Sequence, residues 1–191
     1  KFSVMANSGD VAIYKFVMSI GSSSLAATTS QYALYAYTDS GFSTVDSTFS
    51  AGGLINAGTC FNGLASTAAG PRTISIYPDK TSCNSSATTT YIVPKGLTRY
   101  FQFRATAANV STNTNSKDTI TVNLSGDTAF PTAAATLMLQ AANSSLTSAN
   151  FVWSPVSTTT QNTILDLDFT NGYQVVGLPA IGTTQESVQS Q

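Results

Sequence analysis

Two aspartates, Asp166 and Asp168, are the clearest candidates in this chain for acid chemistry. A hydrolase that works with paired carboxylates needs two acids facing one cleft, and on a regular strand these two lie on one face about 7 Å apart. Leu165, Leu167 and Phe169 alternate with them as inward residues do. We therefore interpret the two acids as the exposed polar face of a strand.

The same region resembles a calcium loop, but only in part. The run Asp166-x-Asp168-x-x-Asn171-Gly172 has the acidic spacing of such loops and lacks the distal Glu. Calcium is the one metal that the sequence leaves open, and we expect no other cofactor.

Nucleophilic catalysis lacks its usual base. The 191 residues contain no histidine, so Ser-His-Asp and Cys-His arrangements cannot form within the chain. No Ser-x-x-Lys motif occurs either. We therefore do not expect an enzyme.

The two cysteines, Cys60 and Cys83, flank an expected strand at Thr73–Tyr77 and lie in segments rich in Gly, Asn and Ser. In an extracellular protein this placement favours a disulfide between two loops, and two unrelated buried thiols are the alternative. Two thiols without histidine make a poor zinc site.

Two other features allow chemistry at a surface. Tyrosines are frequent in the expected strands, and Tyr35 and Tyr37 are our candidates for a platform that binds sugars. Tyr and Trp are also ordinary residues of sandwich cores and interfaces.

Lys15 shares an expected strand face with Val11, Ile13 and Val17. A buried lysine needs a partner, so we expect an edge position or an apolar stem that carries the ammonium group to the surface. The alternative is a covalent crosslink to an Asn.

The composition points to an extracellular protein. Charged residues make up 9% of the chain and the net charge is −1, far below the usual ~25% charged residues. This balance offers nothing to nucleic acid. No apolar run approaches the ~20 residues of a membrane span. The chain begins at Lys1, and we expect a processed product or a segment of a longer one, secreted to the cell surface.

Alternating apolar and polar residues predict an all-β protein, an antiparallel β-sandwich of Ig-like or jelly-roll-like type. The expected central strand is Val11–Ile20, which is apolar on both faces. With the shorter candidates this makes about nine or ten strands. One of the other expected strands begins at Phe2, and another lies around Thr44–Ser50. The rest are Gln31–Thr38, Thr73–Tyr77, Tyr91–Val93, Arg99–Ala107, Asp118–Leu124, Thr136–Gln140, Asn150–Ser154 and Ile164–Phe169.

We interpret residues 1–191 as one domain, and the alternative is a break within 125–135. Long loops at Asp39–Gly70 and Asp79–Thr90 suggest an interface or a binding surface. The polar tail Gly182–Gln191 would be disordered by itself, so it needs a partner in order to become ordered.

Several stretches resemble segments of large secreted cell-surface proteins from uncultivated, small-genome bacteria. They are Ile92-Val93-Pro94-Lys95-Gly96-Leu97-Thr98-Arg99-Tyr100-Phe101, Phe151-Val152-Trp153-Ser154-Pro155, and Thr170-Asn171-Gly172-Tyr173 through Gly177-Leu178-Pro179. The resemblance implies an exported wall, surface-layer or appendage protein built from β-sandwich modules. It carries over no catalytic residues.

The leading functional hypothesis is a structural subunit that assembles with other copies of itself into a surface filament or layer. Exposed sheet edges invite a neighbouring strand, and the N-terminal segment with Phe2, Val4 and Ala6 is the better candidate donor. Gln174–Ile181 is the second candidate. The alternative hypothesis is an adhesin or carbohydrate-binding module of a larger surface protein, with glycans as partners.

Overall fold

The computed structural model describes residues 1–23, 27–56, 72–79, 89–111, 117–130, 148–157 and 168–189. Within these ranges the protein contains ten strands and no helix. All strand pairs are antiparallel. The strands are β1 (Phe2–Met5), β2 (Val11–Ser22), β3 (Thr28–Tyr37), β4 (Arg72–Ile76), β5 (Tyr91–Val93), β6 (Thr98–Ala108), β7 (Thr119–Leu124), β8 (Phe151–Ser154), β9 (Thr170–Asn171) and β10 (Glu186–Gln189).

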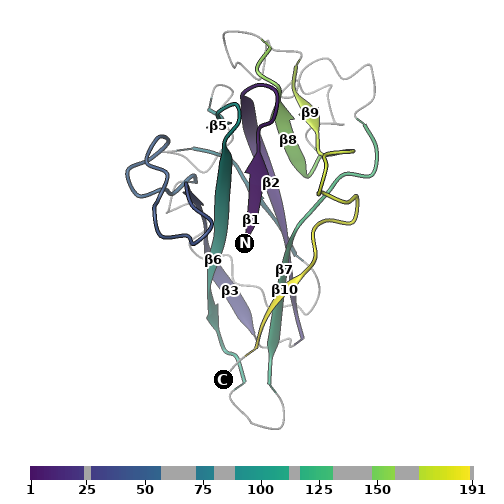
Figure 1. Cartoon of the computed structure of the whole chain (residues 1–191). Coiled ribbons are helices and arrows are strands. Elements are labelled where there is room, and N and C mark those ends of the chain that lie inside the picture. Colours follow the sequence, from purple (N-terminus) through teal and green to yellow (C-terminus); the bar gives the residue numbers. More distant parts are fainter. Residues whose placement is uncertain are drawn as a thin grey trace.

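The strands form two sheets (Figure 1). The small sheet has the order β1-β6-β3, and the large sheet is built around β2 with β4, β5, β7, β8, β9 and β10. The predicted all-β, antiparallel sandwich is confirmed, as is the number of about nine or ten strands.

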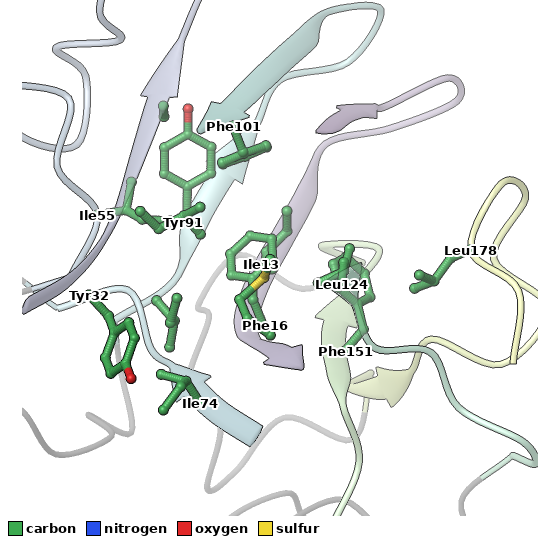
Figure 2. Packing of buried hydrophobic residues seen from close by; sticks show 14 of the residues in the cluster. Ile13, Phe16, Tyr32, Ile55, Ile74, Tyr91, Phe101, Leu124, Phe151 and Leu178 are labelled. Carbon is green, nitrogen blue, oxygen red and sulfur yellow. The ribbon is translucent and has the colours of Figure 1, made fainter. Parts of the chain in front are cut away.

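The core lies between the two sheets and is rich in aromatic rings. Figure 2 shows Phe16 of β2 facing Phe101 of β6 and Phe151 of β8. Its ring centroid lies 5.3 Å from that of Phe101 and 5.6 Å from that of Phe151. A second, smaller cluster on the other face of the large sheet includes Tyr14 and Val152. Strand β2 is therefore covered on both faces, as its continuous apolar sequence predicted.

The large sheet is four strand positions wide, and we call each position a row. Strand β2 fills one row by itself, and two shorter strands share each of the other three. Phe16 pairs with both Ile76 of β4 and Phe151 of β8, so these strands lie on opposite edges of β2. Ile20 likewise pairs with both β4 and β7, and Ile13 with both β5 and β8. Hence β4 and β5 share one edge of β2 while β7 and β8 share the other.

The outermost row repeats this arrangement. Strand β9 pairs with β8, and β10 pairs with β7. Each of these three rows is thus made of two strands that are far apart in the sequence.

One local expectation was wrong, because Val45 makes only an isolated bridge to Tyr37 and Thr44–Ser50 contains no strand. The second donor candidate, Gln174–Ile181, forms turns. The polar tail has its partner in the body of the protein, since β10 pairs with β7 through four residue pairs. The expected strand Thr136–Gln140 lies outside the described residues, as does most of Ile164–Phe169.

Candidate functional site

The outer face of the small sheet carries the tyrosines that the sequence singled out. Tyr32 and Leu34 enter the core, as predicted, while Tyr35 and Tyr37 lie on the opposite face of β3. The β3–β6 register places Tyr35 opposite Gln102. The structure therefore brings both candidate tyrosines together with polar side chains of β6.

Arg104 of β6 organises this outer face. Its guanidinium carbon lies 4.4 Å from the ring centroid of Tyr35. Its Nη2 donates to the Tyr37 hydroxyl at 2.6 Å, and its Nε donates to Gln102 Oε1 at 3.0 Å. The cation is thus stacked on one ring and held by two neutral acceptors.

Tyr37 contributes less to a binding surface than the sequence suggested. Its side chain is buried, and the ring of Phe42 packs edge-on against it at 5.4 Å. Lys1 Nζ lies 4.3 Å from the centroid of Phe42. Phe42 also meets Tyr100 edge-on at 6.1 Å. The accessible part of the surface is therefore centred on Arg104 and the half-buried Tyr35.

One edge of the small sheet is covered by the chain's own loop, residues 38–56. The backbone of Ala36 accepts from Asp46 N at 2.8 Å and donates to Gly53 O at 2.8 Å. Leu34 accepts from Ile55 N at 2.9 Å and donates to Asn56 Oδ1 at 2.7 Å. The outward backbone groups of Leu34 and Ala36 are thereby occupied, which blocks another chain from pairing with this part of β3.

A buried ion pair anchors this loop. Asp46 Oδ2 accepts from Arg99 Nε at 2.5 Å and from the Tyr91 hydroxyl at 2.6 Å. Thr48 donates to Asp46 Oδ1 through its backbone N–H at 2.9 Å and its hydroxyl at 2.6 Å. All four donors compensate the burial of the carboxylate.

Burial and the hydrogen bonds in this cluster shift the pKa values of two side chains. Burial acts to raise the pKa of Asp46, but the hydrogen bonds from Thr48, Tyr91 and Arg99 outweigh it and hold the pKa at about 2. Burial and the neighbouring carboxylate of Asp46 raise the pKa of Tyr91. The sequence analysis missed this cluster. The available signal was Arg99, which lies two residues before the inward Phe101 and so shares its face.

The other edge of the small sheet begins with β1. Phe2 stacks on Phe101 at 5.1 Å and contacts Phe16 at 5.8 Å. Ala6 is fully buried, and its N–H and C=O bond to Leu97 and Gly96 in the turn before β6. The candidate donor residues Phe2, Val4 and Ala6 thus lie in their own chain, along residues Thr98–Phe101 of β6.

Lys15 lies at a bulge of β2. The β2–β8 register shifts between Ile13 and Lys15, so Ile13 and Val11 face the large core while Lys15 faces outward. Lys15 Nζ donates to Ala149 O at 2.7 Å and lies 5.9 Å from the ring centroid of Tyr77. The shared face that we predicted was wrong for Val11 and Ile13, because the bulge reverses the alternation. Val17 lies between the core residues Phe16 and Met18 and does share the face of Lys15. A crosslink through Lys15 stays a prediction.

Asp127 ties together the interrupted rows beside Lys15. Its two oxygens accept from the backbone N–H groups of Asn150, Phe151 and Gly172 at 2.8 Å, 3.1 Å and 2.9 Å. Burial lowers the pKa of Lys15, and the negative charge of Asp127 partly offsets this effect. Asp127 thus joins the start of β8 to the end of β9.

A cavity of about 380 Å³ opens beside this junction, lined in part by Asp127, Asn150 and Asn171. The side-chain Nδ2 of Asn150 donates to Gly126 O, and that of Asn171 donates to Ala129 O, both at 2.6 Å. These amides and the carboxylate of Asp127 therefore hold the surrounding backbone in place.

The remaining chemical candidates are only partly visible. Cys60, Cys83 and Asp166 lie outside the described residues, so the disulfide stays a prediction. Asp168 accepts from the backbone N–H of Ser157 at 3.0 Å. In the ranges that the structure covers, no three Asp, Glu, Cys or His side chains are grouped as a metal site.

Comparisons with protein-family models, with curated proteins and with solved structures found no match to this chain. Across the parts that the structure describes, no helix has the length and apolar character to cross a bilayer.

Proposed function

We propose that this protein is an extracellular structural protein, a subunit of a surface filament or surface layer that assembles with other copies through its strand edges. The observation that carries the proposal is the contrast between the two edges of the small sheet. Loop 38–56 occupies backbone groups of Leu34 and Ala36 in β3, whereas the edge on the other side is formed by the strand β1, which pairs with Thr98–Phe101 of β6.

The composition supports the same function. A surface with few charges and a net charge of −1 repels other copies weakly and tolerates close packing. Natural sandwiches usually guard their edges with charges, prolines or loops. An edge formed by a short strand, beside an edge guarded by a loop, suits strand-mediated assembly.

Strand β1 is a strand that copies of the protein can exchange. It is short, it lies at an edge, and its inward Phe2 and Val4 fill the core while Ser3 and Met5 are exposed. The same contacts with Phe101 and Phe16 would form if β1 came from a neighbour. Its exchange would join subunits without any new interface chemistry.

Association of the native protein tests the proposal directly. Light scattering over a concentration series, with negative-stain electron microscopy, should show concentration-dependent growth into filaments or sheets. A protein that stays monomeric near 20 kDa at the highest concentration would contradict it.

Strand exchange has its own test, in a variant without residues 1–8. We expect this variant to stop polymerising and to bind a synthetic peptide of residues 1–8. The matched control is the same peptide with Phe2→Asp and Val4→Asp, which should not bind. Continued polymerisation of the truncated protein would exclude β1 as the donor.

A second function, an adhesin or carbohydrate-binding module, is favoured by the outer face at Arg104 and Tyr35. An arginine stacked on a tyrosine presents both a cation and an aromatic edge to a sugar. A glycan array with the wild type and Tyr35→Ala would test it. Glycan binding that this substitution leaves unchanged would exclude this surface.

A further inference from the structure

The two arginines of β6 have opposite surroundings. Arg99 is buried, and its Nε bonds to the carboxylate of Asp46. Arg104 lies further along the same strand and is exposed, and its hydrogen bonds go to the neutral side chains of Tyr37 and Gln102. Strands β1, β3 and β6 contain no Asp or Glu. The charge of Arg99 is therefore neutralised inside the protein, whereas no acid of the small sheet neutralises Arg104.

The hydrogen bonds around Arg104 use acceptors and leave donors. Gln102 Oε1 accepts from Arg104 Nε at 3.0 Å, from Arg104 Nη2 at 2.8 Å and from the Tyr37 hydroxyl at 3.2 Å. A guanidinium group only donates, so it selects the oxygen of the Gln102 amide and leaves the amide nitrogen, Nε2, for another partner. Across the described ranges, neither Gln102 Nε2 nor Arg104 Nη1 has a hydrogen-bond acceptor. Both remaining groups are donors, and one of them carries a positive charge.

Neutral contacts hold the guanidinium group of Arg104 in one orientation. Its carbon lies 4.4 Å from the ring centroid of the half-buried Tyr35, and its Nη2 donates to the hydroxyl of the buried Tyr37 at 2.6 Å. A guanidinium group that is already oriented loses little side-chain freedom when it binds an anion. These donors therefore suit a carboxylate, which accepts charge-assisted hydrogen bonds.

The outer face continues on both sides of Arg104 with groups that suit a sugar. Near the start of β6, the half-buried rings of Phe42 and Tyr100 meet edge-on at 6.1 Å. Near the end of β6, the hydroxyl of the exposed Thr106 donates to Gln31 Oε1 at 2.9 Å. Aromatic rings pack against the C–H groups of a sugar ring, and hydroxyl and amide groups form hydrogen bonds with its hydroxyls.

A strained turn places the ring of Phe42 on this face. Phe42 has φ +57°, in the left-handed region that bulky residues rarely adopt. Asp39 holds the turn, because its carboxylate accepts from the backbone N–H groups of Ser43 at 3.2 Å and of Thr44 at 2.6 Å. Backbone strain of this kind is concentrated at functional sites. The same bonds direct the carboxylate of Asp39 to the turn and not to Arg104.

We propose that the outer face of the small sheet binds an acidic sugar, whose carboxylate accepts hydrogen bonds from Arg104 Nη1 and Gln102 Nε2. The aromatic and hydroxyl groups on either side contact the sugar rings that precede and follow it. This inference rests on the second candidate function, carbohydrate binding, and deepens it by naming the class of sugar.

The distribution of charge favours a sugar over an acidic peptide as the occupant. In β3 and β6 the only charged residues are the two arginines, so Arg104 lies among neutral side chains. The net charge of −1 gives the protein no long-range attraction for a polyanion. A polysaccharide in which uronic acids alternate with neutral sugars sets one carboxylate between uncharged rings. That pattern matches this face better than a run of acidic residues does.

The probe is an oligosaccharide in which glucuronic acid alternates with N-acetylglucosamine, and its methyl ester is the neutral match. In isothermal titration calorimetry, the wild type should bind the acid form at least about tenfold more tightly than the ester, because the ester accepts no charge-assisted hydrogen bond. Added salt should weaken the binding of the acid form and leave that of the ester unchanged.

Substitutions of Arg104 separate the charge from the geometry of the guanidinium group. Arg104→Gln should weaken binding of the acid form by about tenfold or more. Arg104→Lys keeps the charge but loses the fork of donors, so it should restore only part of the affinity. The matched control is Lys95→Gln, which removes an exposed cation in the turn before β6 and should leave the affinity unchanged. Urea unfolding shows whether each variant is folded.

The possible outcomes distinguish this inference from the function on which it rests. Equal affinity for the acid and the ester, or equal effects of Arg104→Gln and Lys95→Gln, would overturn the acidic sugar. Carbohydrate binding itself would then still stand if Tyr35→Ala abolished binding on the glycan array. A wild type that binds no glycan on that array would overturn both. Polyglutamate bound as tightly as the oligosaccharide would assign the face to acidic peptides and overturn the sugar as its ligand.

Discussion

The two edges of the small sheet solve the same physical problem in opposite ways. On the β3 side, loop 38–56 bonds to Leu34 and Ala36 and is anchored by the buried Asp46–Arg99 pair. On the β1 side, a strand pairs with Thr98–Phe101 of β6 and forms the edge itself. One edge is thus guarded by a loop, and the other is formed by an exchangeable strand.

The largest effect is expected where the guarded edge is anchored. Arg99→Met should lower the free energy of unfolding by about 3–5 kcal/mol, because the buried carboxylate of Asp46 loses its only charged partner in the described structure. Urea unfolding measures the loss. Loop 38–56 should also exchange its amide hydrogens faster, which would turn a guarded edge into an open one.

The control for Arg99→Met is Glu186→Gln, which removes an exposed acid beside Lys1. Its effect should stay below about 1 kcal/mol. Equal losses in the two variants would show that burial does not set the strength of the Asp46–Arg99 anchor.

Phe2→Ala examines the short strand that forms the other edge. Phe2 is half-buried against Phe101 and Phe16, so its truncation should cost about 2–3 kcal/mol, less than for a fully buried ring. Met5→Ala removes a side chain that is 59% exposed on the same strand, and its effect should be much smaller. If Phe2→Ala were as mild as Met5→Ala, β1 would not be part of the folded core.

Gly53→Ala tests how closely the loop fits the guarded edge. Gly53 has φ +71°, and an added Cβ would lie 2.8 Å from Ala36 O and 2.9 Å from Val45 Cβ. The strained backbone and the close contacts should cost about 1–3 kcal/mol. Gly52→Ala, where no heavy atom lies within 4 Å of the added Cβ, should be close to neutral. An equal loss of stability in the two variants would show that the substitutions act through the unfolded chain rather than through this contact.

The sequence predicted what alternation can encode. The all-β class, the central strand β2, and the faces of Leu34, Phe101 and Phe103 all follow from the burial of apolar side chains at a period of two. The pairing partners did not follow. Residues such as Leu124 and Phe151 lie in one row of the sheet although 26 residues separate them, and no local pattern records such a distance.

The site was harder to predict than the fold, for two physical reasons. A bulge changes the face of a side chain without changing the sequence pattern, so Lys15 was assigned to the wrong face. A buried charge depends on a partner far along the chain, so Asp46 looked like an ordinary loop residue although Arg99 is 53 residues away.

Acid should weaken the edge guarded by loop 38–56 before it affects the edge formed by β1. The pKa of Asp46 is about 2 in the folded protein, against an ordinary value of 3.8. Its carboxylate therefore stabilises the fold fully above pH 3.8, and this contribution of about 1–2 kcal/mol is lost as the pH falls through 2. Asp39, whose pKa is lowered by the N–H groups of Thr44 and Ser43, changes in the same direction. The free energy of unfolding is measured against pH for the wild type and for Asp46→Asn, and the difference between the two curves isolates the contribution of Asp46. Parallel curves between pH 5 and 2 would show that the hydrogen bonds to Asp46 do not favour its ionised form. Because neither β1 nor Thr98–Phe101 contains an acid, the pairing of β1 with β6 should persist over the range in which the anchor of loop 38–56 weakens.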